Sequence, residues 1–394
     1  SAWHAEDRQR RFDLSQPPLL RFGWLRLPEE RTQLVLTYHH ILLDGWSLPL
    51  VLEELLTLYR TQGDALSLPK TTPYSTYLGW LQGRDRASAQ QAWGDYLSGL
   101  EGPTLLARRS ASEDQTQSKS SLTLPIELTQ ALNQQARQQG VTLNTLLQAA
   151  WGILLGKLSS SRDVVFGITV AGRPGELPGV ERMIGLFINT VPLRLRWRAG
   201  ETVVELLERL QREQARLLEY QYLDLAEIQR LAGQRQLFDT LCVFENYPVN
   251  AKAIVQQDEG FGLRHISGGD RYMTHYPLSV MIEPGERMTL NLIYRPASFD
   301  AAKRLGAQLI RLLEAIATVP QSPIDTLPWL DKSERRQLLE EWSGKALDSG
   351  EITLAELFEA QATRQPNAVA LEGPDGRVSY GELDARANRL ASHL

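Results

Sequence analysis

Cysteine is almost absent from this chain, which has one, Cys242, in 394 residues. A single thiol excludes an internal disulfide framework and a zinc site built from cysteines. It is typical of a reduced compartment, so we expect a cytoplasmic protein. An excess of basic charge is also absent, since the formal net charge is −5. Because proteins that bind nucleic acid usually carry a basic surface, nucleic acid is not an expected partner.

Long apolar runs are missing as well. The most apolar stretch, residues 146–158, is interrupted by Gln148 and Lys157. It is shorter than the roughly 20 residues that a membrane-spanning helix needs. We therefore expect a buried core helix there and no membrane partner. The first residues are charged and lack the pattern of a secretory signal.

Apolar periodicity predicts a mixture of strands and helices. Residues 19–27 and 34–40 are expected to form a hairpin in which His39 and His40 point to opposite faces. A helix is expected after Gly45, with Ser47 at its N-cap. Hairpins and crossovers together favour an α/β sandwich over a purely parallel sheet. Further helices are expected within residues 74–100, from the end of the strand 121–125 to residue 139, and over residues 143–158, 203–221 and 300–318. Further strands are expected over residues 121–125, 163–172, 186–197, 238–246, 277–283 and 287–295.

Changes in composition predict five segments along the chain. Residues 107–120 are polar and without periodicity, so they are interpreted as a linker between two lobes, residues 1–106 and 121–330. Residues 331–352 are interpreted as a second linker. A new domain is expected over residues 353–394.

Two of the six histidines stand side by side in YHHILLDGWS, residues 38–47. A histidine at the end of a rigid strand can aim a ring nitrogen into a cleft, where neutral imidazole accepts or orients a proton. Asp44 can anchor the loop, and Gly45 permits a close backbone approach. Two other interpretations remain open: a purely structural histidine, and half of a metal site formed by His40 and Asp44. No third ligand lies nearby in the sequence, so no metal is predicted.

The segment HHILLDG, residues 39–45, resembles the HHxxxDG signature of the condensation domains of nonribosomal peptide synthetases. Three further segments resemble motifs of that family and occur in the same order. They are FGITVAGRP (166–174, with Ala171 where serine is usual), IGLFINT through Arg194 (184–194) and LFD through the segment FENYP (237–248). The resemblance implies a two-lobed α/β sandwich similar to chloramphenicol acetyltransferase, a pseudo-dimer.

The two ends of the sequence differ from a complete domain of that family. Nothing before residue 39 resembles the family's earlier RHExLRT motif, so we expect an N-terminally truncated domain with an incomplete first lobe. It stays open whether such a chain is active alone. VSYGEL, residues 378–383, resembles the first core motif of adenylation domains. Residues 353–394 are therefore expected to begin an adenylation domain.

The resemblance implies an acyltransferase that forms peptide bonds. Family members join a donor acyl or peptidyl thioester to the α-amine of an acceptor aminoacyl thioester. Upstream and downstream peptidyl carrier proteins present both substrates on 4′-phosphopantetheine arms, and the chain itself is expected to bind no cofactor. The motif pattern favours a donor of L configuration. Two alternatives are a non-catalytic platform that docks carrier proteins and an epimerisation domain of the same fold.

The resemblance also implies roles for the residues of the double-histidine motif. His40, the second histidine, is the expected general base or orienter of the attacking amine. Orientation is favoured because an α-amine of pKa about 8 is already partly neutral at physiological pH. His39 is expected to be structural. Asp44 is expected to hold the loop by an ion pair with Arg173, and Gly45 to approach the thioester carbonyl.

Three residues keep two interpretations each. Trp46 and Ser47 line the cleft, or they are a core tryptophan and a helix N-cap. Asn189 lies in the substrate channel, where it hydrogen-bonds substrate or a bridging loop, or it is a polar residue at a strand end.

Overall fold

The computed structural model describes residues 2–28, 32–107, 116–245, 274–298, 302–343, 353–374 and 376–393. The chain divides into two compact units, Ser1–Leu330 and Asp331–Leu394. Among the residues described, no helix is both long enough and apolar enough to cross a membrane. The predicted linker residues 108–115 and 344–352, and residues 246–248 of the last condensation motif, lie outside the described residues.

The first unit is built on a six-stranded mixed sheet. From one edge to the other its strands are β3 (Ser118–Thr123), β8 (Thr289–Tyr294), β7 (Leu278–Glu283), β6 (Thr240–Phe244), β4 (Asp163–Val170) and β5 (Asn189–Arg196). β6 runs parallel to both neighbours, and the other pairs are antiparallel. β3 begins at Ser118, so the last residues of segment 107–120 belong to the sheet instead of a linker. Backbone pairing with β8 explains this, because polar residues can form an edge strand.

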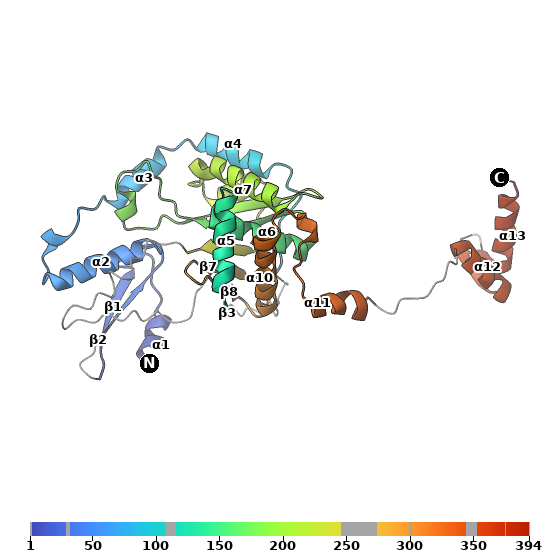
Figure 1. Cartoon of the computed structure of the whole chain (residues 1–394), viewed down its shortest axis with the longest axis horizontal. Coiled ribbons are helices and arrows are strands. Elements are labelled where there is room, and N and C mark those ends of the chain that lie inside the picture. The colour runs from blue at the N-terminus through green and yellow to red at the C-terminus, as the bar shows by residue number, and fades with distance from the viewer. Residues whose placement is uncertain are drawn as a thin grey trace. The chain divides into compact units, whose positions relative to one another are not determined.

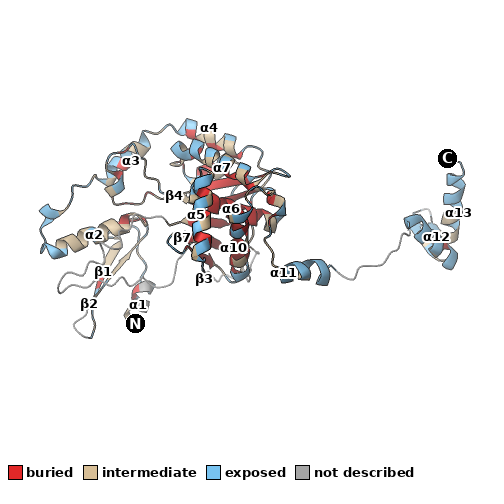
Figure 2. Cartoon of the chain, viewed as in Figure 1, coloured by how far each residue is buried: buried red, intermediate tan, exposed pale blue. Residues whose placement is uncertain are grey.

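Helices pack on this sheet and enclose the main core (Figures 1 and 2). They are α5 (Ile126–Gln138), α6 (Leu143–Ser159), α7 (Val203–Leu217), α8 (Leu225–Leu231) and α10 (Ala302–Thr318). α6 is buried along most of its length, as its apolar sequence predicts. α8 was not predicted, because a seven-residue helix offers too little periodicity.

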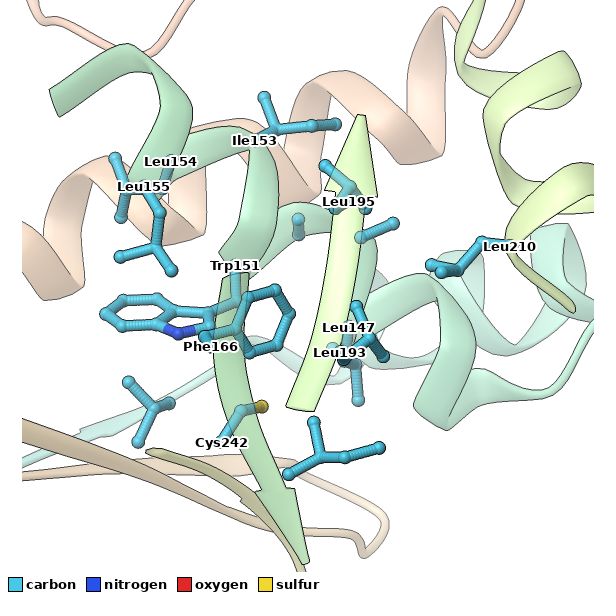
Figure 3. Close-up of a cluster of buried hydrophobic side chains, with 14 of the residues drawn as sticks. Leu147, Trp151, Ile153, Leu154, Leu155, Phe166, Leu193, Leu195, Leu210 and Cys242 are labelled. Atoms are coloured by element: carbon cyan, nitrogen blue, oxygen red, sulfur yellow. The ribbon is translucent and has the colours of Figure 1, made fainter. Parts of the chain in front are cut away.

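The centre of the main core lies between α6 and the sheet. Trp151 lies close to Phe166 and Cys242 there, and Leu193 and Leu195 of β5 lie beside them (Figure 3). Each large apolar side chain buried in this way contributes roughly 1.5–3 kcal/mol. Burial raises the pKa of the Cys242 thiol to about 12, so this cysteine is a packing residue.

A separate hairpin carries the double-histidine motif. β1 (Leu20–Arg26) and β2 (Thr32–Tyr38) pair antiparallel, with Leu20 opposite Tyr38. The predicted hairpin is present, but β2 ends one residue before His39. Both histidines therefore lie in the turn that follows the strand, and the alternation assumed for His39 and His40 does not apply to them.

Further helices flank the hairpin and the sheet. They are α1 (Ala2–Gln9), α2 (Ser47–Arg60), η1 (Ala65–Ser67), α3 (Tyr74–Gln82), α4 (Arg86–Leu97), η2 (Val180–Arg182), η3 (Leu218–Tyr220) and η4 (Ile324–Thr326). A second apolar cluster, distinct from the main core, contains Tyr77 of α3 with Leu177, Val180, Met183 and Phe187. Phe187 of this aromatic cluster donates its backbone N–H to Asp44, so the cluster adjoins the motif loop, residues 39–47.

The second unit is small. It contains α11 (Lys332–Arg336), η5 (Gln337–Glu341), α12 (Leu354–Arg364), β9 (Val369–Gly373), β10 (Gly376–Ser379) and α13 (Tyr380–Ala391). α12 and α13 each begin with a capping box, formed by Thr353 with Glu356 and by Ser379 with Glu382. These pairs fix both helix starts.

Candidate active site

His39 shapes the turn that carries the motif. Its backbone N–H donates to the carbonyl of Leu19 at 2.9 Å, which continues the hairpin by one bond. Its ring Nδ1 accepts the N–H of Ile41 at 3.2 Å, and its carbonyl accepts the N–H of Leu42 at 3.0 Å. The ring also lies edge-on to Phe12, with the centroids 6.5 Å apart. His39 is thus occupied by contacts within the chain.

His40 is exposed, unlike its neighbour. Its imidazole has no hydrogen-bond partner among the residues that the structure describes. The ring nitrogens are therefore free to contact a ligand.

Asp44 is fully buried, with 0% of its surface exposed. One carboxylate oxygen, Oδ1, accepts the N–H of Ser47 at 2.8 Å, and the other, Oδ2, accepts the N–H of Phe187 at 3.1 Å. The backbone N–H of Asp44 donates to the carbonyl of Gly185 at 3.1 Å. These bonds tie the motif loop to a segment about 140 residues later in the chain. With both oxygens occupied and no exposed surface, Asp44 is not placed to bind a metal or abstract a proton.

The predicted ion pair between Asp44 and Arg173 is confirmed. Arg173 Nη2 lies 3.3 Å from Asp44 Oδ1, and the two side chains are 4% and 0% exposed. The guanidinium also donates through Nη1 to the carbonyls of Val180 and Met183. Burial lowers the pKa of Arg173, and the charge of Asp44 opposes that effect. The pair compensates part of the cost of burying both charges.

Aromatic rings and a glycine complete the surroundings of Arg173. Its guanidinium carbon lies 3.9 Å from the ring centroid of Phe187 and 5.4 Å from that of Trp46. Gly172 has a φ of +62°, and a Cβ there would stand 1.8 Å from the carbonyl oxygen of Phe187. Only glycine therefore permits the chain to place Arg173 against Phe187.

Ser47 differs from its predicted role. It is the first residue of α2, whose N-cap is Trp46, so the N-cap prediction is wrong. The reason is that Asp44 already supplies the acceptor for the Ser47 N–H. Trp46 donates through Nε1 to the carbonyl of Glu181 at 2.9 Å. This bond also joins the motif loop to the segment that contains Glu181. Gly45 is partly exposed between the buried Asp44 and the half-buried Trp46.

Residues 1–339 match the family described as "Condensation domain". The chain belongs to the condensation domain family.

Two bacterial synthases are among the relatives of this condensation domain. It is 36% identical over 396 residues to surfactin synthase subunit 3 of Bacillus subtilis, covering 99% of the chain and 31% of that protein. It is 34% identical over 400 residues to tyrocidine synthase 2 of Brevibacillus parabrevis, covering 98% of the chain and 11% of that protein. The chain thus spans well under half the length of these relatives.

Solved structures share the predicted fold. The first condensation domain of the calcium-dependent antibiotic synthetase aligns with a TM-score of 0.66 at 23% identity, covering 84% of this chain and 74% of that one. The X-domain from teicoplanin biosynthesis aligns with a TM-score of 0.69 at 20% identity, covering 82% and 78%. The prediction of an α/β fold similar to chloramphenicol acetyltransferase is confirmed.

Asn189 lies at the first position of β5, where its side chain is engaged within the condensation domain. Nδ2 donates to the carbonyls of Gln221 and Leu223, both at 2.8 Å, and Oδ1 accepts the N–H of Thr190 at 2.9 Å. It thus fixes the loop before α8. Its place in a substrate channel stays a prediction.

The sequence did not point to Tyr74 and Tyr77. Tyr74 donates its hydroxyl hydrogen to the carbonyl of Leu186, and its ring meets Phe187 edge-on at 5.1 Å. Burial raises the pKa of Tyr77 to about 12, in keeping with its place in the aromatic cluster. The aromatic content of residues 74–100 was a signal, but no spacing related it to residues 186 and 187.

Proposed function

We propose that this condensation domain forms an amide bond between two carrier-bound substrates. The α-amine of the acceptor aminoacyl thioester attacks the carbonyl carbon of the donor thioester. A C–N bond forms, the C–S bond breaks, and the amine proton ends on the departing thiol of the donor arm. The peptide product then remains on the acceptor's carrier.

The observation that carries this proposal is the contrast between His40 and the residues after it. His40 is exposed and without a described partner, whereas Asp44 and Ser47 are buried and fully bonded. A free imidazole on a firmly held turn suits a group that meets a mobile substrate.

His40 acts chiefly by orienting the amine, with proton acceptance second. Thioester aminolysis is favourable, and an α-amine with a pKa of about 8 is partly neutral near pH 7. Well-oriented reactants reach effective molarities of roughly 10⁵–10⁸ M, so orientation alone accelerates the reaction greatly. Asp44 and Arg173 hold the turn, and the partly exposed Gly45 offers its backbone to the thioester carbonyl.

The partners of the reaction follow from the same proposal. Upstream and downstream peptidyl carrier proteins bring the substrates on 4′-phosphopantetheine, and the donor is of L configuration. The domain binds no cofactor of its own. Residues 353–394 begin an adenylation domain in cis, and the protein works in the cytoplasm. A first lobe over residues 1–106, a second lobe that begins with β3 and ends at residue 330, and a linker over residues 331–352 belong to this proposal too.

A second candidate is a platform that recruits other proteins without catalysis. The X-domain from teicoplanin biosynthesis has the same fold and was solved in a complex with OxyB. The exposed His40 favours catalysis, because a platform has no need of a free imidazole there. An epimerisation domain is the remaining alternative within the fold.

The experiment uses the synthetase that contains this chain, supplied with loaded donor and acceptor carrier proteins. Intact-protein mass spectrometry and chiral analysis follow the acyl groups on both carriers. Condensation predicts a dipeptidyl group on the acceptor carrier and loss of the donor's acyl group. Inversion of a donor residue without transfer would identify an epimerase, and two unchanged carriers would support the platform.

A further inference from the structure

The hydroxyl of Ser47 forms all of its hydrogen bonds with two residues, Gly185 and Arg173. It donates to the carbonyl of Gly185 at 2.9 Å. It accepts the N–H of Gly185 at 3.1 Å and Nη2 of Arg173 at 2.9 Å. A serine hydroxyl has one donor and two acceptor sites, and all of them are occupied here. The residue is 0% exposed, so water does not substitute for any of these partners.

Ser47 and Asp44 hold the same short backbone segment, residues 185–187. Gly185 bonds the backbone of Asp44 and the side chain of Ser47, and Phe187 bonds the carboxylate of Asp44. The glycine at 185 also makes room for the ring of Tyr74, because a Cβ there would stand 2.2 Å from that ring. The segment leads directly into β5, so it is continuous with the main sheet.

We propose that Ser47 is a positioning residue of the condensation reaction. It acts through Gly185 and Arg173, which it locks to the start of α2, and so fixes the turn of His40 relative to the sheet. This proposal rests on the proposed role of His40. Because Ser47 is buried, it takes no direct part in substrate binding.

Amide hydrogen exchange of the whole chain tests the lock without any reaction. In Ser47→Ala the N–H of Gly185 loses its acceptor, whereas that of Phe187 keeps Asp44. We expect faster exchange at Gly185 by at least about tenfold and a smaller change at Phe187. The matched control is Thr57→Val on the same helix, since among the described residues the Thr57 hydroxyl bonds the carbonyl of Glu53 alone. Equal exchange at Gly185 in both variants would overturn the proposed lock.

Steady-state kinetics of the synthetase test the effect on the reaction. Displacing a reacting group by about 1 Å can cost roughly 100-fold in rate. Ser47→Ala should therefore lower kcat by about 10- to 100-fold while the KM for each carrier protein changes little, and Thr57→Val should match the parent. An unchanged kcat, or a loss confined to KM, would refute the positioning role.

Three further results separate the possible failures. If Ser47→Ala does not fold, Ser47→Cys takes its place with the same expectations, because a thiol is a weak donor and acceptor. If His40→Ala retains full activity, the proposed role of His40 fails, while the exchange result still decides whether Ser47 holds Gly185. If the parent forms no dipeptide at all, the proposed function fails.

Discussion

At the scale of single residues, the buried bonds converge on Asp44. Its carboxylate accepts the backbone N–H groups of Ser47 and Phe187 and forms an ion pair with Arg173. The position of these partners was only partly predictable. The pairing with Arg173 followed from a family resemblance, whereas the bonds to backbone N–H groups depend on a fold that brings distant segments together.

Asp44→Asn should destabilise the first unit. The substitution leaves the Arg173 charge buried without its anionic partner, and breaking a buried pair costs about 3–5 kcal/mol. Because asparagine retains one acceptor oxygen, we expect a loss of about 3 kcal/mol in the free energy of unfolding, measured by urea denaturation. The control is Asp95→Asn, at an exposed carboxylate. A loss no larger than that of the control would contradict the stabilising role of Asp44.

Gly172→Ala should prevent the backbone at residue 172 from packing against Phe187. A methyl group would collide with the Phe187 carbonyl, and the φ of +62° is strained for alanine. We expect a loss of at least about 2 kcal/mol or failure to fold, measured by thermal unfolding. Gly175→Ala is the matched control, because among the described residues no atom outside its chain neighbours lies within 4 Å of its Cβ position. Equal melting temperatures for the two variants would show that the close approach is not required.

At the scale of secondary structure elements, periodic segments were predictable and their ends were less so. The apolar pattern predicts α6 and the hairpin of β7 and β8, which the structure contains. The ends depend on contacts that no local pattern shows. The Ser47 N–H is bonded by the Asp44 carboxylate, and Ser47 is the first residue of α2 instead of its N-cap. Ser118 is part of the sheet because it pairs with β8.

The helix α1 is held on the hairpin by a buried carboxylate. Asp7 accepts hydrogen bonds from Nε of Arg21 and from the Thr37 hydroxyl, so it joins both strands. The bond from Arg21 holds the pKa of Asp7 below its usual value, and that from Thr37 adds to this effect. A lowered folded pKa stabilises the fold above the unfolded pKa, and the contribution disappears as the pH falls through the folded pKa.

Asp7→Asn should therefore lower the melting temperature by a pH-dependent amount. The gap between variant and parent should be equal at pH 7 and pH 5 and should narrow below about pH 3.8, where Asp7 of the unfolded chain becomes protonated. Thermal unfolding followed by circular dichroism at these values measures the gap. A gap that widens as the pH falls would mean that the hydrogen bonds to Asp7 do not favour its ionised form.

At the scale of the whole molecule, the described residues of the first unit form two separate apolar clusters. The main core fills the space between the sheet and its helices, and the aromatic cluster supports the motif loop. The α/β architecture was predictable because the order of elements and the family motifs agreed. The aromatic cluster was not, because Tyr77 and Phe187 are far apart in sequence and no motif relates them.

The proposed catalysis depends on an exposed imidazole presented by a rigid turn. The most direct test is the rate of dipeptide formation by the synthetase in single turnover with loaded carriers. Misplacing a reacting group by about 1 Å can cost roughly 100-fold in rate, so loss of the orienting imidazole in His40→Ala should slow product formation by at least about 100-fold. His275→Ala, at another exposed histidine, should match the parent. Equal rates for His40→Ala and the parent would contradict the central claim.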